Sequence, residues 1–238
     1  MAYRRDYWDL EPESLSELNT VLHSCDLLSF SADQPGRLAV ITLAVEVLPP
    51  EWPPTIWYPL VLALHPVGRI AASHRVGDST AGRPSGEPHI VRPMQLPDVN
   101  QVISTFSTHW IDDWDPIDPP VGFRFEWRDQ LSLDAQWGGE RAHYLELWQD
   151  DGPTQTLDIG VWFGQLYLLD ADLRPIDRPA LTAWSQRYDA EMARLHAAAG
   201  GRSVGVTSPP PPQIRSADVL QRLTDPNNPT THVKVHLP

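Results

Sequence analysis

The chain is poor in cysteine and has no long apolar run. Cys25 is its single cysteine, so no internal disulfide can form. The longest apolar run, residues 38–48, contains Glu46 and is far shorter than the roughly 20 residues of a membrane-spanning helix. The first eight residues, MAYRRDYW, lack the apolar stretch of a secretory signal. We therefore expect a cytoplasmic protein without a membrane segment.

Basic residues are also scarce. The chain has 18 Lys and Arg against 31 Asp and Glu, which gives a net charge of −13 and a pI near 5.0. Binding to DNA or RNA depends on Lys and Arg that neutralise phosphates, so this balance argues against a nucleic-acid partner. The same charge favours encounter with a basic protein surface. The sequence therefore predicts a protein partner with a basic surface, although acidic proteins are also simply soluble.

Catalytic signatures are missing as well. The sequence contains no Gly-rich phosphate loop, no G-x-S-x-G elbow and no C-x-x-C pair. Cys25 is followed by Asp26, whose carboxylate raises the pKa of a thiol, so a buried structural cysteine is the better interpretation. These absences favour a non-catalytic protein with no cofactor, without excluding an enzyme.

Alternating apolar residues dominate the middle of the chain, over residues 121–174. Phe123, Phe125 and Trp127 alternate with charged residues, which is typical of a strand with one face in water. The pattern continues in residues 131–137 and 157–163, and residues 165–170 are predicted to fold back after Gly164. This stretch predicts an antiparallel meander that forms the core.

Helices and further strands are predicted around this meander. A capping box of Ser14 and Glu17 predicts a helix over residues 13–23, and a second helix is expected to start at Asp98. The third helix has an apolar stripe that ends before Gly200 and is expected to pack across the sheet. Its stripe consists of Leu181, Trp184, Tyr188, Met192 and Leu195. Strands are expected at residues 27–32, 37–47, 55–64 and 69–73, with the last two separated by Pro66 and Gly68.

These elements predict an α+β fold, in which one or two predominantly antiparallel β-meander sheets are flanked by three to four helices. We expect residues 1–95 to form a helix and a meander, and residues 96–200 to add a helix, a meander and the closing helix in the same compact domain. Residues 201–238 are expected to form a Pro-rich linker and extended tail, with two helical turns at residues 216–223. The two halves align as a pseudo-repeat, but alternating strands produce this likeness without common descent.

The acidic loop at residues 109–118 concentrates potential ligands. His109, Asp112 and Asp113 lie close enough in sequence to bind a divalent metal, although their spacing matches no calcium loop. The plainer interpretation is a solvated loop in which aspartates cap turns. Asp112, Asp113 and Asp115 with Trp114 would also offer a negative surface with an aromatic side chain to a basic partner. His65, His74 and His89 match no metal motif, so their presence is better explained by chance.

Trp162 is the most informative of the ten tryptophans. Ile159, Val161 and Phe163 occupy the inner face of its strand, so Trp162 should point outward. Three functions remain open: a protein-interaction module comparable by analogy with adaptor or bacterial immunity proteins, a binder of small apolar ligands, and a metal-dependent hydrolase that uses the acidic loop. The first is preferred, because the other two require a specific arrangement of ligands or a cavity that the sequence does not show. It assigns protein binding to Asp112, Asp113, Trp114, Asp115 and Trp162.

Overall fold

The computed structural model describes residues 7–8, 10–22, 25–53, 57–77, 90–106, 130–138, 142–151, 154–198, 214–225 and 227. The helices are α1 (Pro12–Leu22), α2 (Val99–Ile103), α3 (Arg178–Ala198), α4 (Ser216–Thr224) and the short 3-10 helix η2 (Leu96–Asp98). The strands are β1 (Cys25–Asp33), β2 (Leu38–Val45), β3 (Tyr58–Val76), β4 (Ile90–Val91), β5 (Leu133–Gln136), β6 (His143–Asp150) and β7 (Gln155–Leu169).

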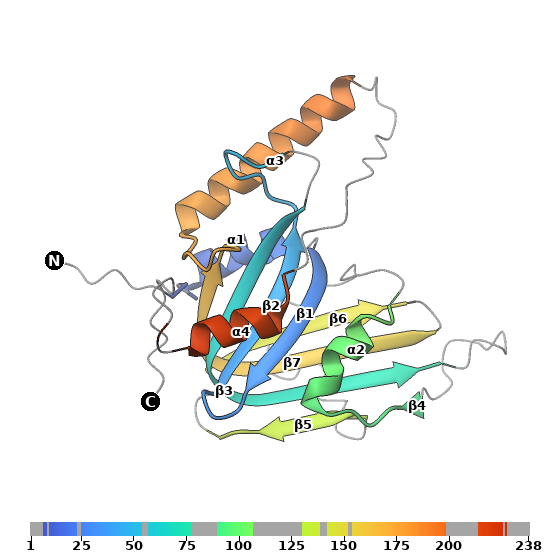
Figure 1. Cartoon of the computed structure of the whole chain (residues 1–238). Coiled ribbons are helices and arrows are strands. Elements are labelled where there is room, and N and C mark those ends of the chain that lie inside the picture. The colour runs from blue at the N-terminus through green and yellow to red at the C-terminus, as the bar shows by residue number, and fades with distance from the viewer. Residues whose placement is uncertain are drawn as a thin grey trace.

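All of these strands belong to one antiparallel sheet. The strand order is β1-β2-β3-β7-β6, and β4 and β5 pair with the second half of β3 (Figure 1). The prediction of an α+β fold with an antiparallel sheet and flanking helices is confirmed. The described strands form one sheet and not two, because the β3–β7 pair connects strands from both parts of the chain.

The two central strands are much longer than predicted. The sequence predicted a break in β3 at Pro66 and Gly68 and a turn in β7 at Gly164, and both predictions are wrong. Each strand continues through these residues, and the two pair from Val61–Leu169 to Val76–Gln155. A register shift between Val67 and Arg69 absorbs the irregularity as a β-bulge, which lets the paired strands bend without ending.

Hydrophobic side chains cover both faces of the first part of the sheet. All eight residues of β2, which lies between β1 and β3, are buried. On one face, Leu43 and Leu62 pack in the main core with α1 and α2. On the other face, Val40 and Val61 form a smaller core that α4 covers with Val219. Helix α4, predicted at residues 216–223, therefore docks on the sheet although it lies within the predicted tail.

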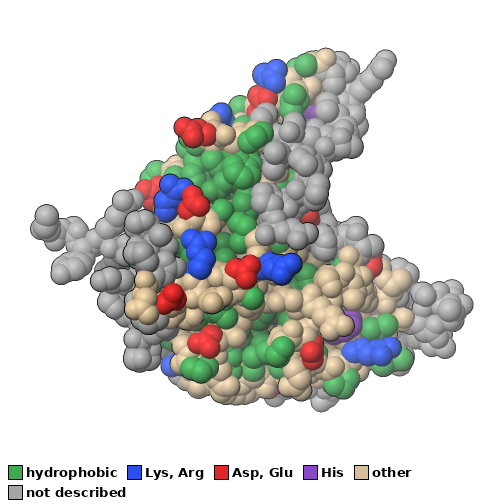
Figure 2. Space-filling view, viewed as in Figure 1, with side chains coloured by type: hydrophobic (Ala, Val, Ile, Leu, Met, Phe, Trp, Pro, Cys, Tyr) green, Lys and Arg blue, Asp and Glu red, His purple; other side chains and the backbone are tan. Residues whose placement is uncertain are grey.

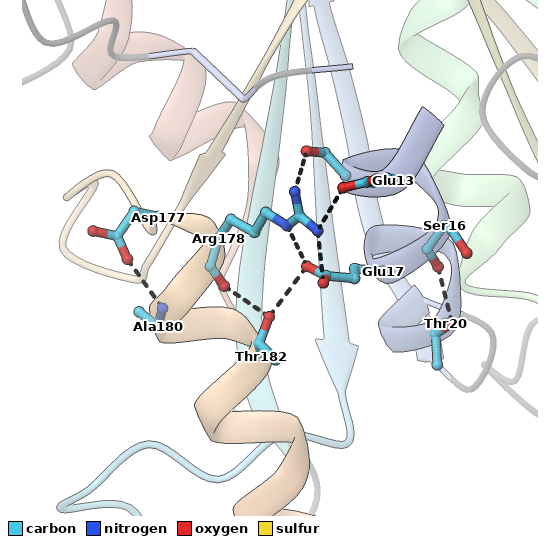
Figure 3. Close-up of polar contacts among 9 residues, drawn as sticks. Glu13, Ser16, Glu17, Thr20, Asp177, Arg178, Ala180 and Thr182 are labelled. Atoms are coloured by element: carbon cyan, nitrogen blue, oxygen red, sulfur yellow. Dashed lines mark hydrogen bonds and ion pairs between the residues drawn. The ribbon is translucent and has the colours of Figure 1, made fainter. Parts of the chain in front are cut away.

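Helix α1 is joined to α3 by an ion pair (Figure 3). Arg178 Nε and Nη2 donate to the two carboxylate oxygens of Glu17 at 2.7 and 2.9 Å, and Thr182 Oγ1 donates to the same carboxylate at 3.2 Å. The predicted capping box is wrong, because α1 already begins at Pro12 and Ser14 is buried inside it. Glu17 therefore serves tertiary structure and does not cap its own helix.

Only the N-terminal part of α3 packs against the body. Leu181 is its one buried residue, and the rest of the helix extends away from the sheet in Figure 1. The helix therefore does not pack across the sheet as predicted. Trp184 is partly buried against the ring of Tyr58, with the ring centroids 5.4 Å apart.

Figure 2 shows hydrophobic side chains gathered beside α3, with charges of both signs spread over the rest of this face. Among the described residues, no helix is long and apolar enough to cross a membrane.

Candidate functional site

Most of the residues predicted to act in binding lie outside the described residues. This applies to His109, Asp112, Asp113, Trp114 and Asp115, so their proposed roles remain predictions. Trp162 is described, and it lies on β7 with Ile159, Val161 and Phe163 buried on the opposite face. Its outward orientation agrees with the alternation in the sequence, and its side chain is half-buried.

Trp162 belongs to a row of side chains that crosses four strands. In register, this row runs from Gln136 on β5 through Arg69 on β3 and Trp162 on β7 to Tyr144 on β6. We call these four residues the aromatic row. The Arg69 guanidinium lies 4.6 Å from the centroid of the Trp162 ring, and the centroids of the Tyr144 and Trp162 rings are 4.7 Å apart. Cation–π and aromatic contacts of this kind hold the indole in one orientation.

Arg69 is itself held by a carboxylate. Its Nε and Nη2 donate to Asp134 Oδ1 and Oδ2 at 2.7 and 3.1 Å, and Gln136 Nε2 donates to Asp134 Oδ2 at 3.0 Å. A bidentate pair fixes the plane of the guanidinium as well as its position. The side chain of Arg69 is 16% exposed and that of Asp134 is 32% exposed, so this pair lies at the boundary with solvent.

Gly160 provides the space that Tyr144 needs. A Cβ at Gly160 would lie 3.0 Å from both Cε2 and Oη of Tyr144, so the phenol ring crosses directly over this glycine. The Tyr144 hydroxyl donates to Glu146 Oε2 at 2.9 Å. Because Gly160 has no side chain, the Tyr144 ring of β6 can pack closely against the backbone of β7.

Two fully buried carboxylates lie beside the aromatic row on the same face. Glu146 pairs in register with Gly160, and Asp158 lies two residues further along β7. Arg75 Nη2 forms an ion pair with Asp158, and Ser73, which pairs with Asp158 across β3 and β7, is also fully buried. A buried carboxylate requires compensation by charge or hydrogen bonds, which Arg75 supplies for Asp158. This network gives the aromatic row a rigid polar support.

The described residues offer little support for a metal centre or an apolar cavity. Among them, no group of three or more His, Cys, Asp and Glu is placed to hold a metal ion. His65 and His74 are nine residues apart on one extended strand, which separates them by about 30 Å. The inner face of β7 is filled by Ile159, Val161 and Phe163, which are completely buried in the core.

The remaining acidic and thiol groups near α3 and β1 have clear physical explanations. Cys25 is fully buried, and burial together with Asp26 raises the pKa of its thiol, as expected for a structural cysteine. Burial also raises the pKa of Glu46, which forms a hydrogen bond with Tyr188 and lies near Asp26 and Asp189. Neither group is suited to nucleophilic catalysis.

Comparison of the chain with protein-family models, with curated proteins and with solved structures finds no match. The site must therefore be judged on its own residues. Of these, the sequence alone identified Trp162 and missed Arg69, Tyr144, Glu146 and Asp158. A signal was present, because Asp158, Gly160 and Trp162 alternate with the apolar residues of their strand. Their cross-strand neighbours depend on register, which the sequence pattern did not provide.

Proposed function

We propose that the protein is a non-catalytic interaction module that binds another protein through the aromatic row. The observation that carries this proposal is the stack of Arg69, Trp162 and Tyr144 across three adjacent strands. Trp, Tyr and Arg are the residues that most often dominate the binding energy of protein interfaces. A sheet surface that already holds them in place loses little side-chain freedom when a partner binds.

The partner proposed here has a basic surface. The chain has a net charge of −13, and Asp134 exposes part of its carboxylate beside the aromatic row. Opposite charge on the partner would accelerate the encounter and make the association sensitive to salt. The acidic loop residues Asp112, Asp113 and Asp115, with Trp114, are proposed as a second part of the same interface. An adaptor or immunity-like role fits this chemistry by analogy alone.

The proposal is tested by comparing three forms of the full chain as immobilised bait in an extract of the source organism. These forms are the wild type, Trp162→Ala and the control Ile90→Ser, which alters an exposed apolar side chain on β4. A specific partner should be retained by the wild type and the control, and lost with Trp162→Ala. The purified pair should then form a complex that weakens as salt rises.

Two results would count against this function. The first is a partner that binds Trp162→Ala as tightly as the wild type, which would remove the aromatic row from the interface. The second is a set of captured proteins that is identical for all three baits and independent of salt. Circular dichroism and thermal unfolding of each bait would show that the variants are folded.

A further inference from the structure

Arg37 and His65 form a second polar cluster, in which His65 precedes Arg69 of the aromatic row by four residues on β3. Arg37 ends the turn between β1 and β2, and His65 lies in the middle of β3. The pairing of Ala39 with Leu64 brings the start of β2 beside His65. Two further bonds join the turn to this part of β3, because Val67 N–H donates to Arg37 O at 2.7 Å and Arg37 Nε donates to Val67 O at 3.1 Å.

The guanidinium of Arg37 is anchored but incompletely satisfied. Its Nε is used by Val67, whereas its buried Nη2 has no hydrogen-bond partner among the described residues. No ion pair of Arg37 with a carboxylate is formed within that part of the chain. The nearest acidic residue of the turn, Asp33, accepts instead from Gly36 N–H at 2.7 Å. Arg37 is half-buried, and a buried guanidinium nitrogen that has no hydrogen-bond acceptor is costly.

His65, on the strand beside Arg37, carries a second nitrogen without a hydrogen-bond partner in the described part of the chain. Its residue is 8% exposed, and its buried Nε2 has no hydrogen-bond partner among the described residues. Burial lowers the pKa of His65, and the positive charge of Arg37 lowers it further. Gln165 lies opposite His65 on β7, but its Oε1 accepts from the Tyr167 hydroxyl at 3.2 Å.

The backbone holds Arg37 in an uncommon conformation. Its φ of 48° lies in the left-handed region, which non-glycine residues rarely adopt. Strain of this kind is most often found where a side chain must be held in a functional position. Gln34 and Pro35 of the same turn are exposed, so Arg37 lies close to solvent along the chain.

We propose that Arg37 and His65 form a binding site for a small oxyanion, a phosphate or a carboxylate group, that accepts from Arg37 Nη2 and His65 Nε2. Such an anion would give Arg37 a counter-charge and could accept a hydrogen bond from each of the two nitrogens. Both nitrogens are buried, so binding requires the structure around them to open. The proposed site shares no residue with the aromatic row.

The test is an NMR titration of the full chain with inorganic phosphate, in parallel with acetate and with sodium chloride at matched ionic strength. The pKa of His65 is followed in the wild type, in Arg37→Gln and in the control Arg187→Gln, which alters an exposed arginine of α3. A bound anion within reach of the imidazole should raise its pKa by about 1–3 units. Thermal unfolding is recorded for the same samples, because an anion that binds the native state raises the midpoint.

A saturable rise in the His65 pKa, present in the wild type and Arg187→Gln and absent in Arg37→Gln, is the expected result. A response to phosphate without a response to acetate assigns the site to phosphate groups, and a response to both extends it to carboxylates. The proposal is overturned if neither anion acts beyond the chloride control. It is also overturned if Arg37→Gln, folded by circular dichroism, responds as the wild type does.

Discussion

The side-chain amide of Asn100 forms both of its hydrogen bonds with the backbone of Phe30. Phe30 N–H donates to Asn100 Oδ1 at 2.7 Å, and Asn100 Nδ2 donates to Phe30 O at 2.6 Å. Phe30 lies on β1, the strand at one end of the sheet order, where backbone groups that face away from β2 have no neighbouring strand. Asn100 of α2 thus makes the hydrogen bonds that a neighbouring strand would make, and it protects this edge from pairing with another chain.

Replacing Asn100 with Ala should therefore destabilise the fold and uncover the edge of β1. Loss of both bonds leaves a part-buried N–H and C=O unsatisfied, so we expect the free energy of unfolding to fall by about 1–3 kcal/mol. Urea unfolding measures this change, with Gln101→Ala on an exposed position of the same helix as control. Equal stability of Asn100→Ala and Gln101→Ala would show that the edge does not need this amide.

Gly160→Ala should displace the Tyr144 ring, since its new Cβ would lie 3.0 Å from two atoms of the phenol. We expect a loss of about 1–3 kcal/mol in the free energy of unfolding, the usual cost of overpacking. The same substitution should cost much less in a Tyr144→Ala background, where the ring is absent. A double-mutant cycle by denaturant unfolding measures this coupling. Additive effects of the two substitutions would mean that the ring does not constrain Gly160.

Local sequence patterns predicted most helices and strands, but not the contacts between residues that are far apart in the sequence. Leu18 and Leu22 have helical spacing and are both buried in α1, and alternation placed Trp162 on the outer face of β7. The pattern of Ser14 and Glu17 is genuinely that of a capping box, yet Glu17 binds Arg178, which is 161 residues away. No local rule contains that partner, because it depends on how α1 and α3 meet.

The residues at the bend of the sheet show a second limit of the sequence. Pro66 and Gly164 interrupt apolar runs, and each predicts the end of a strand. Both lie between the same two cross-strand pairs, His65–Gln165 and Val67–Phe163. The proline and the glycine therefore meet at one place where two long strands bend together. Only knowledge of the register distinguishes a shared bend from two separate turns.

Glu46→Gln should change how stability depends on pH. Burial raises the pKa of Glu46 above its ordinary value of 4.5, so the native state holds this proton more tightly than the unfolded chain. The stability that Glu46 contributes is therefore complete below about pH 4.5 and is lost as pH rises through the native pKa. The neutral glutamine loses nothing over this range, so the stability difference between variant and wild type should shift in favour of the variant as pH rises. Urea unfolding at pH 4–8 checks this, and a constant difference would contradict it.

Removing Arg75 should destabilise the protein more than removing Arg69. Arg75 pairs with Asp158, which is fully buried, whereas Arg69 pairs with Asp134, whose side chain is 32% exposed. In Arg75→Met, Asp158 loses its positive partner where water cannot replace it, and we expect a loss of about 3–5 kcal/mol in the free energy of unfolding. In Arg69→Met, solvent reaches the remaining carboxylate, so we expect a loss nearer about 1 kcal/mol.

Adding Asp158→Asn to Arg75→Met separates the cost of the uncompensated charge from the loss of packing by the arginine stem. The amide is neutral and nearly the same size, so the double variant should regain much of the stability that Arg75→Met loses. Chemical unfolding of the wild type, Arg75→Met, Asp158→Asn and the double variant at one pH measures this recovery. A double variant less stable than Arg75→Met would mean that the Asp158 carboxylate is held by its other contacts, and that Arg75 acts through packing. Recovery would show that the polar network supporting the aromatic row depends on charge compensation by Arg75.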